Sequence, residues 1–317
     1  MTKRIVLCTT GRHPVFDALL QSSHQITAFI DFGKPECQLS QRHFLYNRFH
    51  EHVLRRPKTA AAVCRSHGIP YLHVRGRELE QASQLIKNID VDVMVVAQAP
   101  ILPRSFFSLL SDQAINLHPS KLPHYRGADP FFWMAVDQVT EVAATVHMLT
   151  DQVDQGDILA QATRSVELGL SQQQLSRIAV KELGAPLVVE TLDRFDDLIK
   201  ARQPQPSSNG VSSTRRVSPK NFHDVVDLAS FTLDQAWNVL RFTQNWSNVI
   251  DSRHGPDRMY RWEVLGRDRV VPKRNQIGDD AERIEIRQGR WYYLHPEGDI
   301  EIQRRFNPGG FIRSCIT

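Results

Sequence analysis

The sequence predicts an α/β protein in which a Rossmann-like, mostly parallel sheet is followed by a smaller β-rich domain. Three observations support this fold class. Strand and helix signals alternate over the first two hundred residues, which is typical of parallel sheets with crossover helices. The run Val91–Ala97 is almost entirely apolar, as expected for a strand buried on both faces. A Pro- and Ser-rich stretch at 203–213 then separates this region from several short alternating segments.

Each element of the first region has its own signal. Short segments rich in β-branched and apolar residues predict strands at Ile5–Thr10, Gln25–Asp31, Ile69–Val74, Val91–Ala97, Ala114–Leu117, Glu141–Leu149 and Asp157–Val166. Apolar residues at helical spacing predict helices at Pro14–Ser22, Thr59–His67, Glu78–Ile89 and Ser171–Arg202, the last as one helix or two.

The C-terminal third changes in character. Thr232–Thr243 has the spacing of a helix, and strands are predicted at Tyr260–Leu265, Arg283–Arg287, Trp291–Leu294 and Ile300–Arg304. We therefore divide the chain into a large domain at 1–203, a linker at 204–216 and a small β-rich domain at 217–317.

Composition excludes several classes of protein. The chain has 317 residues, of which 41% are hydrophobic and 23% charged, so it can form an ordinary core. Its four cysteines are widely spaced and form no CxxC pair, which disfavours a zinc site and fits a reducing compartment. The apolar start is too short for a signal peptide or membrane span. We expect a cytoplasmic protein without a metal or a membrane partner, and the net charge of +4 does not demand nucleic acid.

Two polar motifs follow predicted strands. The first runs from Asn116 through His118 to Gly127, and the second contains Asp154, Gly156 and Asp157. Because side chains of an extended segment repeat every second residue, Asn116 and His118 are expected on the same side. An amide, an imidazole and a carboxylate are the groups needed to move an acyl group onto an amine, since one must stabilise an oxyanion and another must accept a proton.

These motifs resemble those of the formyltransferases that use 10-formyltetrahydrofolate, which carry an Asn-x-His-Pro-Ser-x-Leu-Pro-x-x-Arg-Gly segment and a later Asp-x-Gly-Asp. The resemblance implies that Asn116, His118 and Asp154 are catalytic. Asn116 and His118 would stabilise the oxyanion, while Asp154 would orient His118 and assist proton transfer. It also implies N10-formyltetrahydrofolate as co-substrate, without a metal.

A second stretch, 97–103, resembles the segment of the family that lines the pterin pocket. The expected co-substrate contacts are Gln98, Ile101, Leu102, Thr150 and Val153. Core packing at the start of a helix explains Ile101 and Leu102 equally well. Pro100 has no backbone N–H to offer a ligand.

Four further residues are candidates for binding the acceptor. No Gly-x-Gly-x-x-Gly follows the first strand, which argues against nicotinamide binding. Arg12 and His13 stand there instead and could meet a phosphate, or form a solvated turn. Arg126 could bind phosphate or carboxylate bidentately, or form a salt bridge within its loop. Asp129 could meet an ammonium group, or cap a helix.

The amine that receives the formyl group is less clearly specified. The insert 41–58 mixes basic and aromatic residues, but it lacks the composition of the RNA-contacting insertion in the initiator-tRNA formyltransferases. Asp129 and the bulky Phe131, Phe132 and Trp133 favour the branch that acts on small amines. We therefore predict a small acceptor, specifically a nucleotide-linked amino sugar.

Three alternatives stay open: formylation of methionyl-tRNA, hydrolysis of formyltetrahydrofolate, and a non-catalytic nucleic-acid-binding module. The C-terminal domain resembles the barrel of oligonucleotide-binding type in longer family members only loosely. Whether it recognises the acceptor or forms a homodimer is not decided by the sequence.

Overall fold

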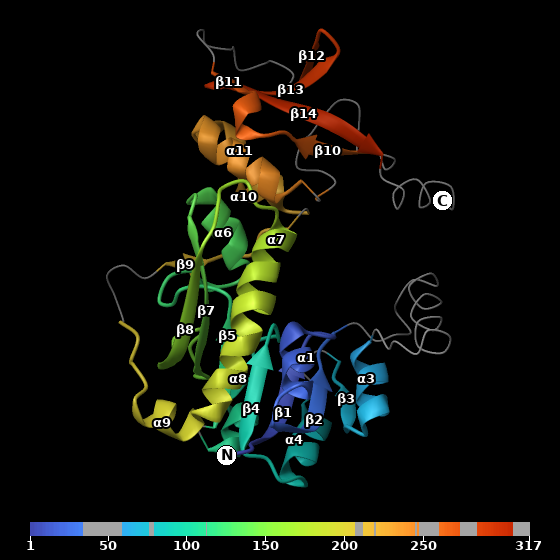
Figure 1. Ribbon diagram of the computed structural model, residues 1–317, viewed down its shortest axis with the longest axis vertical. Helices are drawn as coiled ribbons and strands as arrows, with labels where there is room; N and C mark the ends of the chain where they lie inside the picture. The colour runs from blue at the N-terminus through green and yellow to red at the C-terminus, as the bar shows by residue number, and fades with distance from the viewer. Residues whose placement is uncertain are drawn as a thin grey trace. The chain divides into compact units, whose positions relative to one another are not determined.

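The computed structural model describes residues 1–33, 59–75, 79–111, 113–206, 212–218, 220–244, 246, 260–272 and 284–306. The basic and aromatic insert 41–58 therefore lies outside the described residues. Contacts divide the chain into two compact units (Figure 1). The first comprises residues 1–127, 143–164 and 177–213, and the second comprises 128–142, 165–176 and 214–317. The predicted linear boundary at 204–216 stays a prediction.

The first unit is built on a seven-stranded sheet in the order β3-β2-β1-β4-β5-β7-β8. Five neighbouring strands are parallel, and β5 pairs with β7 in antiparallel fashion. The fold class predicted from the sequence is thus confirmed. The strands are β1 (Arg4–Thr9), β2 (Gln25–Asp31), β3 (Tyr71–His73), β4 (Val93–Ala97), β5 (Ala114–His118), β7 (Glu141–Met148) and β8 (Ile158–Ser165).

Alternation along the central strands creates a hydrophobic core on each face of this sheet. Ile5 and Leu7 of β1 pack on one face with Phe16 of the first helix, whereas Val6 and Cys8 pack on the other. Burial on both faces explains why these strands appear in the sequence as continuous apolar runs. The helices of this unit are α1 (Pro14–Leu20), α3 (Ala60–His67), α4 (Glu80–Lys87), α5 (Arg104–Phe107), the 3-10 turn η2 (Ser108–Leu110), the π-helical turn η3 (Arg177–Gly184), α8 (Ala185–Asp193) and α9 (Phe195–Lys200).

Local sequence explains where these helices begin and how closely they pack. Thr59 accepts a hydrogen bond from the backbone N–H of Ala62 and caps α3, as a threonine at this position usually does. Pro186 has no N–H for the helical ladder, and a π-helical turn precedes it. Gly184, the last residue of η3, lets η3 approach the sheet closely, because an added Cβ there would lie 2.9 Å from the side chain of Leu117.

The second unit combines short helices with an antiparallel sheet in the order β10-β14-β13-β12, with β11 also paired to β14. Thr232 and Gln235 form a capping box at the start of its longest described helix, and Phe132 packs against Phe242 in its interior. Closure of this sheet into a barrel stays a prediction. The elements are α6 (Pro130–Val136), α7 (Gln172–Ser176), α10 (Phe222–Val225), η4 (Leu228–Ser230), α11 (Leu233–Phe242), β10 (Tyr260–Val264), η5 (Arg267–Arg269), β11 (Val270–Pro272), β12 (Ile284–Arg287), β13 (Arg290–His295) and β14 (Gly298–Phe306).

A separate two-stranded pair joins β6 (Arg126–Gly127) to β9 (Ser213–Thr214). Across the residues that the structure describes, we find no helix with the length and apolar character needed to cross a membrane.

Candidate active site

The carboxyl ends of the parallel strands carry the polar loops of the first unit. The order of the strands reverses between β1 and β4, and ligands of such sheets bind beyond the carboxyl ends at this reversal. The loops after the two strands meet there, because the hydroxyl of Thr10 donates to the carbonyl oxygen of Gln98 at 2.6 Å. His118 is the last residue of the next strand, β5.

The structure brings Asn116, His118 and Asp154 together. One carboxylate oxygen of Asp154 lies 3.4 Å from Nδ1 of His118 and accepts the backbone N–H of Gly127 at 2.8 Å. The other oxygen lies 3.3 Å from the amide nitrogen of Asn116. Only 10% of the Asp154 side chain and 6% of the His118 side chain are exposed, so these groups interact in a largely water-free environment.

The cluster contains a fourth polar residue, His147, which was not among the site residues predicted from the sequence. Its Nε2 lies 3.0 Å from the amide nitrogen of Asn116 and 3.4 Å from Asp154. Because its Nδ1 faces the carbonyl oxygen of Met148 at 2.9 Å, Nδ1 donates, so Nε2 accepts from Asn116 when the ring is neutral and donates to Asp154 when the ring is protonated. The available signal was a single imidazole within the mostly apolar strand β7. This strand pairs with β5 so that His147 stands opposite Asn116.

Burial and contacts set the charges of this cluster. Burial alone would raise the pKa of Asp154, but the contact with His147, the charges of both histidines and the Gly127 N–H outweigh it and lower this pKa to about 2. Burial lowers the pKa of His118, although Asp154 and the carbonyl oxygen of Tyr125 oppose that effect. Near neutral pH the site therefore contains an ionised carboxylate beside a neutral imidazole.

The geometry around His118 leaves room for one more proton. Its Nε2 lies 2.8 Å from the carbonyl oxygen of Tyr125, and its Nδ1 faces Asp154. A neutral imidazole carries one N–H, yet two oxygen acceptors face its two nitrogens. The ring can thus take up a proton and satisfy both acceptors.

The residues predicted to contact the co-substrate lie on two neighbouring loops. Ile101 and Val153 are 71% and 42% exposed, which is unusual for large apolar side chains. An ion pair of 2.7 Å between Arg104 and Asp151 ties the two loops together. Gln98 is exposed and has a positive φ of 55°, Thr150 donates its hydroxyl to the carbonyl oxygen of Gln152, and Leu102 is buried in the core.

The four residues predicted to bind the acceptor are already engaged. Arg12 pairs with Asp17, and the buried ring of His13 accepts the N–H of Val15 at the start of α1. Burial lowers the pKa of His13 to about 4. The guanidinium of Arg126 is buried and donates to Gln205 and to the carbonyl oxygen of Pro206. Asp129 belongs to the second unit, where its carboxylate accepts the N–H of Val217.

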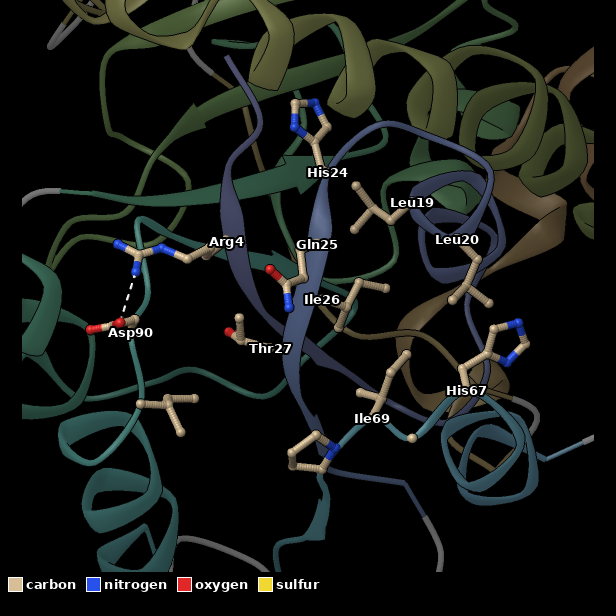
Figure 2. A pocket seen from close by; sticks show the side chains of 13 residues that line it. Arg4, Leu19, Leu20, His24, Gln25, Ile26, Thr27, His67, Ile69 and Asp90 are labelled. Atoms are coloured by element: carbon tan, nitrogen blue, oxygen red, sulfur yellow. Dashed lines mark ion pairs between the residues drawn. The ribbon is translucent and has the colours of Figure 1, made fainter.

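A cavity of about 600 Å³ lies at the opposite, amino-terminal edge of the strands (Figure 2). Its wall includes Arg4, which pairs with Asp90, and the apolar residues Leu20, Ile26 and Ile69. None of the residues predicted to act in catalysis or binding lines it. In the described part of the chain, no group of three or more His, Cys, Asp or Glu side chains could hold a metal ion.

Comparison with known proteins places this site in context. Methionyl-tRNA formyltransferase from Citrifermentans bemidjiense is 34% identical over 141 residues, which cover 44% of each chain. The corresponding enzyme from Rickettsia prowazekii is 29% identical over 153 residues, or 48% of this chain and 49% of its own. The chain thus matches about half the length of these curated relatives.

Solved structures show the same architecture. An N-formyltransferase from Helicobacter canadensis, in complex with folinic acid and dTDP-3-aminofucose, has a TM-score of 0.62 at 14% identity and covers 96% of this chain and 100% of its own. WlaRD, a sugar 3N-formyl transferase, has a TM-score of 0.60 at 15% identity and covers 96% and 98%.

The family suggested by the two motifs is confirmed by a family model. The model described as formyl transferase matches residues 4–192, which is more than half of the sequence and includes Asn116, His118 and Asp154. This chain belongs to the formyl transferase family.

Proposed function

We propose that this protein transfers the formyl group of N10-formyltetrahydrofolate to the primary amine of a small acceptor. The observation that carries the proposal is the buried cluster in which the Asp154 carboxylate contacts Asn116 and His118 at the carboxyl edge of the parallel sheet. Family membership supports the same chemistry. The co-substrate supplies an activated formyl group, and no metal is needed for its transfer.

Each catalytic residue has a role that follows from its contacts. The amide of Asn116 exchanges its long hydrogen bond to Asp154 for one to the formyl oxygen as negative charge develops there. His118 takes up the proton released by the attacking amine, because its ring has one N–H for two acceptors. Asp154 remains ionised and stabilises the resulting imidazolium, which then returns the proton to the departing nitrogen.

The loops at this edge have groups suited to a reduced pterin. Ile101 and Val153 offer exposed apolar surface for a flat ring, on loops held together by Arg104 and Asp151. Backbone groups of 98–103 and 150–153 would bind the polar edge of the ring. The core position of Leu102 favours a packing role for that residue.

We further propose a nucleotide-linked amino sugar as the acceptor. Its support is architectural: the likeness to the two sugar N-formyltransferases extends over 96% of this chain. The sequence matches to methionyl-tRNA formyltransferases cover 44–48% of the chain, a measure that is not comparable with the structural coverage. Asp129 and Trp133, which suggested a small amine, make internal contacts in the second unit with Val217 and Arg215.

Methionyl-tRNA is the second candidate acceptor, because the sequence relatives that match the catalytic region carry that name. We place either reaction in the cytoplasm, since Cys8 and Cys64 are free thiols.

A formyl-transfer assay distinguishes these functions. The protein would be incubated with 10-formyltetrahydrofolate and a panel of amino-sugar nucleotides, amino acids and charged initiator tRNA. We expect saturable turnover with an amino-sugar nucleotide. Turnover confined to tRNA, with binding that weakens by a log–log slope of about −0.7 per phosphate contact as salt rises, would replace this acceptor with the second candidate. Formate release without any amine would show a hydrolase, and no reaction under any condition would overturn the proposal.

A further inference from the structure

The side chain of Gln205 uses its full hydrogen-bonding capacity next to the catalytic carboxylate. Its Nε2 donates to the backbone carbonyl oxygen of Asp154 at 3.0 Å and to that of Gly156 at 2.6 Å. Its Oε1 accepts two hydrogen bonds from Arg126, at 3.0 and 2.7 Å. A primary amide offers two donors and two acceptor sites, so all four are occupied.

Arg126 fixes the orientation of this amide. A guanidinium can only donate, so it must face Oε1 and thereby directs both N–H groups of Gln205 towards the loop that carries Asp154. Arg126 is 6% exposed, and its side chain also donates to the carbonyl oxygen of Pro206. The arrangement joins three segments that are distant in sequence: β6, the Asp154 loop and the stretch that follows α9.

Asp154 requires such support because of its backbone. It adopts a φ of +53°, in the left-handed region that non-glycine residues adopt only with support from their surroundings. On the other side of the loop, Gly156 lies so close to β7 that an added Cβ would overlap the carbonyl oxygen of Met148. The loop is thus held between β7 and Gln205.

We propose that Gln205 is a positioning residue for the formyl transfer, which keeps Asp154 in its left-handed conformation so that the carboxylate faces His118 and Asn116. This inference rests on the proposed function. Without the two hydrogen bonds from Gln205, Asp154 relaxes towards a right-handed or extended backbone. Its carboxylate then turns away from His118, and the proton-accepting pair is lost.

Two substitutions separate the contact with the loop from the contact with Arg126. Gln205→Glu retains two oxygens for Arg126 but removes both donors and sets a carboxylate oxygen against the two loop carbonyls. Gln205→Met removes both contacts without adding charge. Gln203 provides matched controls, because its side chain is exposed and its backbone alone pairs with Ile158. Gln203→Glu and Gln203→Met introduce the same chemistry two residues away.

We expect both Gln205 variants to lower kcat by about 10²-fold, the effect typical of a misplacement of about 1 Å, with little change in KM for the co-substrate. The Gln203 variants should keep the original kcat. Melting temperatures for all four variants verify folding.

In Gln205→Met, His118 loses its anionic neighbour, so its titration and the acid limb of kcat move to lower pH. Besides His118, the groups that face Asp154 are His147, Asn116 and the Gly127 N–H, with Arg126 close by.

Imidazole nitrogen NMR of His118 provides a readout that does not depend on turnover. A lower His118 titration midpoint in Gln205→Met than in the original protein or Gln203→Met supports the inference, even if no acceptor is formylated and the proposed function fails. The inference would be overturned if the original protein is active and the Gln205 variants keep its kcat and its His118 titration. The proposed function would then remain intact.

Discussion

The two edges of the parallel sheet differ in how they use polar groups. At the carboxyl edge, Asp154 and His118 face each other with 10% and 6% of their side chains exposed, and both pKa values are shifted. At the amino edge lies a cavity of about 600 Å³, but Arg4 on its wall is 40% exposed and forms ion pairs with Asp90 and Asp92.

This difference agrees with the proposed location of the chemistry at the carboxyl ends of the strands. The carboxyl ends of parallel strands bring several loops to one place, so side chains distant in sequence can converge on a ligand. The hydrogen bond from Arg4 lowers the pKa of Asp92, but exposed ion pairs of this kind are screened by water and contribute little to stability. Substitutions at the carboxyl edge should therefore change catalysis, whereas those at the amino edge should change stability alone.

Replacing His118 should have the largest effect. His118→Ala removes the group proposed to accept the amine proton, so we expect turnover to fall by about 10²–10⁴-fold while the fold persists. The measurement is kcat together with circular dichroism and thermal unfolding. Because His118→Ala also removes the hydrogen bond between His118 and the carbonyl oxygen of Tyr125, His118→Asn serves as a second variant that can still donate a hydrogen bond. Near-normal activity in both would remove His118 from the mechanism.

Replacing Asp154 should slow transfer without preventing co-substrate binding. Asp154→Asn retains an oxygen for the Gly127 N–H but loses the charge that stabilises the His118 imidazolium. We expect kcat to fall by about 10²-fold, at the lower end of the range for acid–base groups. Fluorescence titration with a folate analogue should show nearly unchanged affinity. Loss of affinity with unchanged kcat would mean that Asp154 binds the folate rather than assisting proton transfer.

The pH dependence of kcat should reveal the state of His118. In the proposed mechanism His118 is the base, so activity should fall as pH decreases through its pKa, by about tenfold per pH unit below it. Burial lowers this pKa, so the acid limb should lie below the ordinary value of 6.5. Asp154, with a pKa of about 2, stays ionised throughout this range. An acid limb above pH 6.5 that is absent in His118→Asn would show that the charge of Asp154 raises the pKa of His118 by more than burial lowers it.

Sequence patterns identified most of the fold because burial on both faces leaves a strong signal. The apolar run Val91–Ala97 contains β4, and Gln25–Asp31 coincides with β2. The prediction for Ser171–Arg202, one helix or two, was less accurate in detail. The segment contains several helical pieces, with a π-helical stretch before Pro186. Such a change in the hydrogen-bond ladder depends on tertiary packing and leaves no periodic signal.

The convergence of Asn116, His118 and Asp154 could be predicted because two residues share one side of a strand and the third lies in a recognisable motif. His147 could not, because its proximity depends on the register between β5 and β7, which the sequence does not specify. The contacts of Gln205 could not be predicted for the same reason. Its contacts with Asp154 and Arg126 connect residues 51 and 79 positions apart.

The smallest expected effect lies at the amino edge, and it tests the comparison most directly. Ile26→Val removes one methylene group from the cavity wall, where Ile26 is 8% exposed and packs into the core. Such a change typically lowers the free energy of unfolding by about 0.5–1.5 kcal/mol, and we expect kcat to stay unchanged. Gln25→Ala, at the exposed neighbouring position, is the control and should leave both quantities unaltered. Urea unfolding and the transfer assay measure the two effects separately. A fall in kcat for Ile26→Val, with the protein fully folded at the assay temperature, would show that the amino edge is coupled to the catalytic cluster, and the two edges could then no longer be treated as independent.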